Sequence, residues 1–97
     1  MKIKIQSIHF DADKKLLDFV EEKVGKLKHY NSSIIESEVF LRLDKSSDLE
    51  NKVAEIKSHV SGTDLFAKKH AESFESAIDK AFEAVLVQIK KHKETHG

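Results

Sequence analysis

Hydrophobic and polar residues alternate at the start of the chain and then change to a helical period. Ile3 and Ile5 alternate with lysines, which predicts a half-buried strand that continues toward Phe10. Asp13 can cap a following helix, because its carboxylate is placed to accept amide hydrogens of the first turn. From Lys14 to His29, apolar residues recur at spacings of three and four, which predicts a helix with one buried side. That side consists of Leu16, Phe19, Val20, Val24 and Leu27.

Alternation with period two returns after a turn at residues 30–33 and predicts three more strands. The inward-facing residues of the first are Val39, Leu41 and Leu43, and those of the second are Ala54, Ile56, Ser58 and Val60. A polar, acidic hairpin loop separates these two strands at residues 44–51. A tight turn at residues 61–64 contains Gly62, which can adopt a positive φ. The last strand begins at Leu65, is short, and fades into the polar run 68–70.

A long amphipathic helix is predicted at the end of the chain, with Ser73 as its cap. Its apolar stripe consists of Phe74, Ile78, Ala81, Phe82, Val85, Leu86 and Ile89. The predicted order is therefore β-α-β-β-β-α in a single domain of residues 1–97. Because two helices and one sheet each carry an apolar face, we expect an α+β two-layer sandwich. Its four-stranded sheet carries both helices on one face, and strands two to four form an antiparallel meander.

The charge balance changes what this fold can bind. The 97 residues include 17 Lys and Arg against 17 Asp and Glu, so nucleic-acid binding requires local segregation of charge. Cysteine is absent, which removes disulfides and thiolate chemistry. The first residues lack the apolar core of a signal peptide, and no run is long enough to span a bilayer. We therefore expect a cytoplasmic protein without a membrane partner.

Residues that carry enzyme chemistry are sparse. Only three glycines occur and none belongs to a phosphate-cradling loop. Among the six histidines, only His92 and His96 have the i,i+4 spacing of a helical metal pair. They lack an obvious third ligand, so they are interpreted as solvated histidines in a basic tail. We expect no catalytic residues, no cofactor, no metal and no small-molecule substrate.

Lysines gather in three places, and acidic residues gather elsewhere, around residues 44–50 and at Glu36 and Glu38. The lysine groups are Lys14, Lys15, Lys23, Lys26 and Lys28, then Lys68 and Lys69, then Lys90, Lys91 and Lys93. With the helices side by side, their outer surface would carry a basic stripe suited to RNA phosphates. Exposed aromatics that could stack bases are restricted to Phe40 or Phe66, which disfavours single-strand reading.

Lys23 and the terminal lysines also have simpler explanations. On a helical wheel Lys23 falls inside the apolar arc, where its stem could cover the edge of the core while its ammonium group reaches water. The terminal lysines could merely complement the dipole of the last helix. The charge pattern alone leaves both alternatives open.

Several short motifs, in order, resemble a known family. They are the run Lys23, Lys26, Leu27 and Tyr30, the Val39–Leu41 strand, Gly62, the triplet Ala77-Ile78-Asp79, and the closing Gln88, Lys91, His92 and Lys93. Over essentially its whole length the chain resembles the short ribosome hibernation promoting factors. These are relatives of the ribosome-associated inhibitor protein and are also called sigma-54 modulation proteins.

The resemblance implies a fold like the double-stranded-RNA-binding domain and a function on the ribosome. Such proteins dock in the small subunit between head and body, cover the tRNA and mRNA sites, and repress translation in stationary phase or stress. By this resemblance Lys23, Lys26, Lys91 and Lys93 would contact ribosomal RNA phosphates. Lys28 and Lys90 are added from charge and position. The family usually carries basic residues where this chain has Ala84 and Val87.

The expected protein is thus a translation inhibitor bound to ribosomal RNA and a monomer away from the ribosome. Whether it promotes ribosome dimers or only blocks the decoding channel is not encoded in a recognisable motif. The alternative is a protein–protein interaction module that modulates transcription, in which the lysine stripe is only a solvated face. Binding that survives high salt would favour this alternative, because phosphate binding weakens steeply as salt rises.

Overall fold

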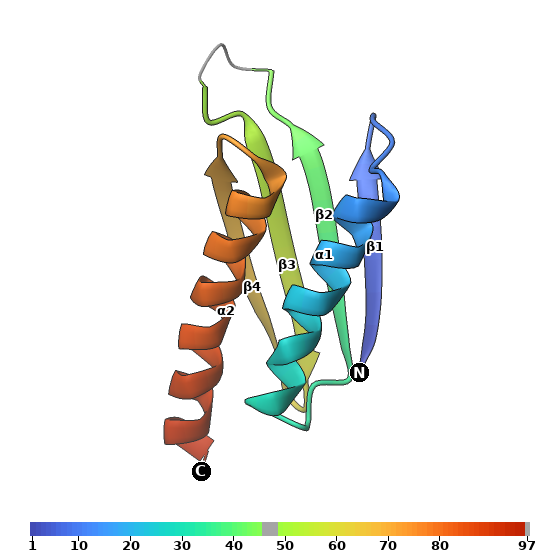
Figure 1. Cartoon of the computed structure of the whole chain (residues 1–97). Helices are drawn as coiled ribbons and strands as arrows, with labels where there is room; N and C mark the ends of the chain where they lie inside the picture. The colour runs from blue at the N-terminus through green and yellow to red at the C-terminus, as the bar shows by residue number, and fades with distance from the viewer. Residues whose placement is uncertain (46–48, 97) are drawn as a thin grey trace.

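A computed structural model describes residues 1–45 and 49–96, with side chains described through residue 92. The elements are β1 (Lys2–Ile8), α1 (Lys14–Gly25), a 3₁₀ helix η1 (Lys26–His29), β2 (Glu36–Leu43), β3 (Lys52–Val60), β4 (Thr63–Ala71) and α2 (Phe74–His96). The two helices lie side by side against one face of the sheet (Figure 1). The predicted α+β two-layer sandwich is confirmed.

The four strands lie in the order β1-β2-β3-β4. Strands β2, β3 and β4 form the predicted antiparallel meander, in which Val39 lies opposite Ile56 and Ile56 opposite Ala67. Strand β1 pairs with β2 in parallel, with Ile5 opposite Val39. A parallel pair needs a crossover connection, and α1 supplies it.

Alternation along the strands sends apolar side chains toward the helices and charged side chains to the opposite, open face. The largest fully buried apolar side chains are Leu27, Leu41, Ile56, Ile78 and Ile89, contributed by η1, β2, β3 and α2. Two buried serines on the helix side of the sheet, Ser37 and Ser58, satisfy each other through a hydrogen bond of 2.8 Å. Apart from Val53 on the open face, the buried apolar residues form one contiguous core between the two layers.

Both predicted helix caps and the glycine turn are confirmed. The Asp13 carboxylate accepts a hydrogen bond of 2.8 Å from the Leu16 amide. The Ser73 hydroxyl oxygen accepts one of 3.1 Å from the Ser76 amide. Gly62 has φ 87°, a conformation that side chains with a Cβ rarely adopt.

The first strand is shorter than predicted. It ends at Ile8 because His9 adopts a left-handed conformation with φ 64°, which turns the chain out of the sheet. Phe10 therefore does not extend the strand. Its ring instead stacks on Phe74 at the start of α2, with 4.8 Å between ring centroids and 9° between the planes. This contact ties the β1–α1 connection to the second helix.

Three further predictions were wrong. The first helix changes to 3₁₀ geometry at Lys26 and does not continue as an α-helix to His29. Strand β4 runs through nine residues to Ala71, since its exposed polar side chains concealed the alternation. Leu43 is 49% exposed and outside the core, because it is the last residue of β2. In the described part of the chain, none of the helices has the length and apolar character needed to cross a membrane.

Candidate RNA-binding surface

The predicted site lysines lie at one end of the molecule. Helices α1 and α2 run in the same direction, so their C-terminal ends lie together (Figure 1). Lys26 and Lys28 belong to η1, which continues α1, while Lys90 and Lys91 belong to the last turns of α2. All four side chains are exposed. The fold thus gathers two lysine groups that the sequence separates.

Acidic residues are few in the two segments that form this end, with Glu94 alone in the last turn of α2. Residues 23–33 and residues 84–92 contain no aspartate or glutamate, although the whole chain is electrically neutral. Among the described side chains, Lys26, Lys28 and Lys90 have no carboxylate within ion-pair distance. This is the local segregation of charge that a neutral chain needs for binding a polyanion. We call the surface formed by Lys23, Lys26, Lys28, Lys90 and Lys91 the basic end.

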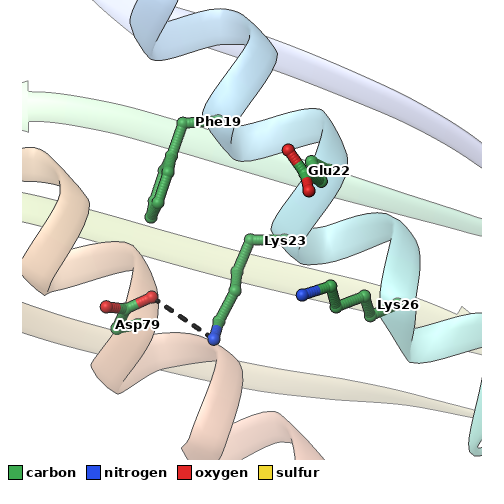
Figure 2. A pocket seen from close by; sticks show the side chains of 5 residues that line it. All are labelled: Phe19, Glu22, Lys23, Lys26 and Asp79. Atoms are coloured by element: carbon green, nitrogen blue, oxygen red, sulfur yellow. Dashed lines mark ion pairs between the residues drawn. The ribbon is translucent and has the colours of Figure 1, made fainter.

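Lys23 occupies a groove between the helices. Figure 2 shows it reaching from α1 toward α2, with Phe19 on one side and Lys26 on the other. Its ammonium nitrogen lies 3.5 Å from the Asp79 Oδ1 atom and 4.8 Å from the centroid of the Phe82 ring. Its side chain is only 26% exposed. Lys23 therefore lies at the edge of the core, as the simpler interpretation expects, but its ammonium group contacts Asp79 and the Phe82 ring, so its charge is already partly satisfied within the protein.

The groove itself is balanced in charge. It has a volume of about 290 Å³, and the charged groups that line it are two ammonium groups, from Lys23 and Lys26, and two carboxylates, from Glu22 and Asp79. An approaching phosphate would meet attraction and repulsion together inside the groove. The more strongly basic part of the surface begins beyond it, at η1 and residues 84–92 of α2.

Two residues that the sequence singled out lie outside the described side chains. The backbone of Lys93 is helical, but its side chain is not described, and the same holds for His96. The partner of His96 in the helical pair, His92, is half-buried. The phosphate contact of Lys93 and the solvated state of the histidine pair therefore stay predictions.

The open face of the sheet differs from the basic end. Its charges alternate in sign and pair with one another, as in the contacts of Arg42 with Glu55 and of Lys4 with Glu36. The two aromatic candidates, Phe40 and Phe66, also lie on this face, where Phe66 is 47% exposed. The prediction that exposed aromatics are restricted to these two was wrong, because Tyr30 at the end of η1 is 41% exposed and lies beside the basic end.

The family model described as sigma 54 modulation protein / S30EA ribosomal protein matches residues 3–96. The chain belongs to this family. A ribosome hibernation promoting factor from Azotobacter vinelandii is 32% identical over 94 residues, covering 97% of this chain and 84% of that protein. A ribosome hibernation promotion factor from Bacillus subtilis is 32% identical over 93 residues. That alignment covers 96% of this chain and 49% of the Bacillus protein, so the chain spans about half of its length.

Solved structures show the same fold. A ribosomal subunit interface protein from Coxiella burnetii superposes with a TM-score of 0.86 at 16% identity, over 97% of this chain and 99% of that one. The N-terminal domain of Protein Y from Thermus thermophilus superposes with a TM-score of 0.81 at 24% identity, over 95% and 99% respectively. The family model and the curated relatives confirm the resemblance to ribosome hibernation promoting factors.

Gln88 helps to position the basic end, a role that the sequence did not predict. The side-chain amide of Gln88 in α2 donates a hydrogen bond of 2.6 Å to the Phe66 carbonyl oxygen and accepts one of 3.1 Å from the Phe66 amide. The pair of bonds fixes the C-terminal half of α2 against β4. In the sequence, Gln88 is notable only as part of the closing motif. The apolar pattern of the helix predicts which side is buried, but it does not predict a hydrogen bond to the edge of a strand.

Proposed function

We propose that this chain binds the small ribosomal subunit at its tRNA and mRNA channel and represses translation in stationary phase or stress. The observation that carries the proposal is the basic end, where lysines from two helices gather in segments, residues 23–33 and 84–92, that contain no aspartate or glutamate. The names of the relatives support it, because they are ribosome hibernation factors. We further propose that the protein acts in the cytoplasm and is a monomer away from the ribosome.

In this mechanism the protein blocks the channel sterically and catalyses no reaction. Lys26, Lys28 and Lys90, whose ammonium groups pair with no carboxylate among the described side chains, face ribosomal RNA phosphates, and Lys91 and Lys93 extend the same surface. Lys23 contributes from the groove only where a phosphate can compete with Asp79. Because phosphate contacts fix position without reading sequence, the bound protein occupies the channel by shape and charge. Repression follows because the occupied channel cannot accept tRNA and mRNA.

The proposal is tested by co-sedimentation of the untagged protein with ribosomes in sucrose gradients at low and moderate salt. The unmodified chain is expected to migrate with the small subunit or the whole ribosome and to dissociate as salt rises. Lys26→Glu should abolish this comigration, because it places a carboxylate among the phosphate contacts. Lys15→Glu is the matched control: it makes the same charge change on an exposed residue at the other end of α1 and should bind normally.

Two outcomes would overturn the proposal. Protein that remains at the top of the gradient at low salt would show that the basic end does not bind ribosomes. Comigration that survives moderate salt and the Lys26→Glu change would favour a protein–protein contact, the alternative function of an interaction module. A ribosome-dimer peak in the same gradients would assign the chain to the subtype that pairs ribosomes.

A further inference from the structure

Three side chains on the open face of the sheet converge on one point. Glu36 and Glu38 lie two residues apart on β2, so both point to the same face, and His59 on β3 lies directly opposite Glu36. One ligand atom from each of these three residues lies within 4.8 Å of the others. All three are half-buried, which limits how far they can move apart. Two residues from one strand and one from its neighbour thus form the corners of a compact triangle.

The distances suit an ion better than they suit hydrogen bonds. The His59 Nε2 atom lies 3.9 Å from a Glu36 oxygen and 3.8 Å from a Glu38 oxygen, too far for either hydrogen bond. Two ligand atoms bound at about 2.0–2.2 Å to one tetrahedral ion are separated by about 3.3–3.6 Å. The two distances from His59 Nε2 therefore exceed the spacing within a coordination shell by only a few tenths of an ångström.

The outer partners of these residues hold the ligand atoms in the required orientation. The Asp64 Oδ1 atom lies 2.7 Å from the His59 Nδ1 atom, which fixes the ring and leaves Nε2 facing the carboxylates. Lys4 lies 3.4 Å from the Glu36 Oε1 atom, so the other oxygen of Glu36 is the one that faces His59. A carboxylate that orients a ligating histidine through its second nitrogen is the usual support of a zinc ligand. Neither outer contact needs to break when an ion binds.

We propose that Glu36, Glu38 and His59 form a binding site for a divalent transition metal ion of the zinc class. Two carboxylates neutralise its charge, the imidazole supplies the nitrogen ligand that such ions prefer, and water completes the coordination on the exposed side. The site lies on the sheet face opposite the helices, so it does not depend on the proposed ribosome binding. A simple network of ion pairs is the competing explanation of the same contacts.

Isothermal titration of the untagged full chain with zinc chloride tests the site. One ion per chain is expected, while magnesium should not bind measurably, because it favours oxygen ligands in octahedral geometry. His59→Ala should remove binding. Asp64→Asn should weaken it by about tenfold, since it disturbs only the support of the ring. His70→Ala is the matched control, because it removes the other histidine of the open face, which lies beside Asp44.

Circular dichroism confirms that each variant is folded, and amide chemical shifts give a second readout. Zinc should shift the amide signals around residues 36–38 and 59 in the unmodified chain. Unchanged zinc affinity in folded His59→Ala would overturn the proposal and leave the ion-pair network as the explanation. Loss of binding in the double variant His92→Ala, His96→Ala, with His59 intact, would equally overturn it by placing the ion on α2.

Discussion

Lys23 combines a packing role with a candidate binding role. Its stem covers the edge of the core between the helices, and its ammonium group contacts Asp79 and the Phe82 ring. A charge reversal at this position would place a carboxylate beside Asp79, so it would test packing and binding together. Removing the charge while keeping the stem separates the two roles.

Lys23→Met is expected to fold and to bind ribosomes with a weaker dependence on salt. Methionine is close to lysine in length, so only the ion pair and the cation–π contact are lost, at a cost of about 1 kcal/mol in the free energy of unfolding. The slope of log affinity against log salt should fall by about 0.7–0.9, the share of one phosphate contact. Chemical denaturation and salt-dependent co-sedimentation measure the two effects. An unchanged slope would assign Lys23 to packing alone.

The buried pair of Ser37 and Ser58 makes a second prediction at this scale. Ser58→Ala should lower the free energy of unfolding by about 1–3 kcal/mol, because it leaves the Ser37 hydroxyl buried without its partner, 3.4 Å from the weak acceptor Met1 Sδ. The double variant Ser37→Ala, Ser58→Ala should cost less than the sum of the single variants. Urea unfolding of all four proteins measures the coupling, and additive costs would contradict it.

At the scale of elements, helix α2 both covers the sheet and carries part of the basic end. Its inner side covers β3 and β4, and its Gln88 amide closes on the Phe66 backbone at the edge of the sheet. An open strand edge is a template for unwanted pairing with another chain, so this contact also protects β4. The same helix carries Lys90 and Lys91 on its outer side.

Val87 is the position in α2 where the basic end could be extended. It is 52% exposed, and it lies one turn before Lys91 and one turn after Glu83. Val87→Lys should leave stability nearly unchanged and tighten ribosome binding at low salt, with a salt slope steeper by about 0.7–0.9. Val87→Gln is the control that adds polarity without charge. Equal binding by both variants would place this side of α2 away from RNA. Ala84 is half-buried against the core and is less suited to the same change.

At the scale of the whole molecule, periodicity predicted the elements better than their ends and contacts. The order of strands and helices followed from alternation and helical spacing, because each element buries one face. The left-handed His9 and the exposed end of β2 at Leu43 were not predicted, since they depend on the layer packed above them. Likewise, no local pattern relates Lys23 to Asp79, or Glu36 to His59. Those contacts arise from the register of neighbouring elements, which only the assembled fold determines.

The parallel pairing of β1 with β2 sets an order of assembly. Strands β2, β3 and β4 follow one another in sequence, so their pairing closes only short loops, whereas β1 must wait for α1 to cross before it meets β2. It is also an edge strand in a parallel pair, the slightly weaker kind of ladder. We therefore expect the amides of β1 to exchange with deuterium faster than those of β3 under native conditions. The strand that comes first in the sequence of this domain would then be the last to join the sheet and the first to leave it.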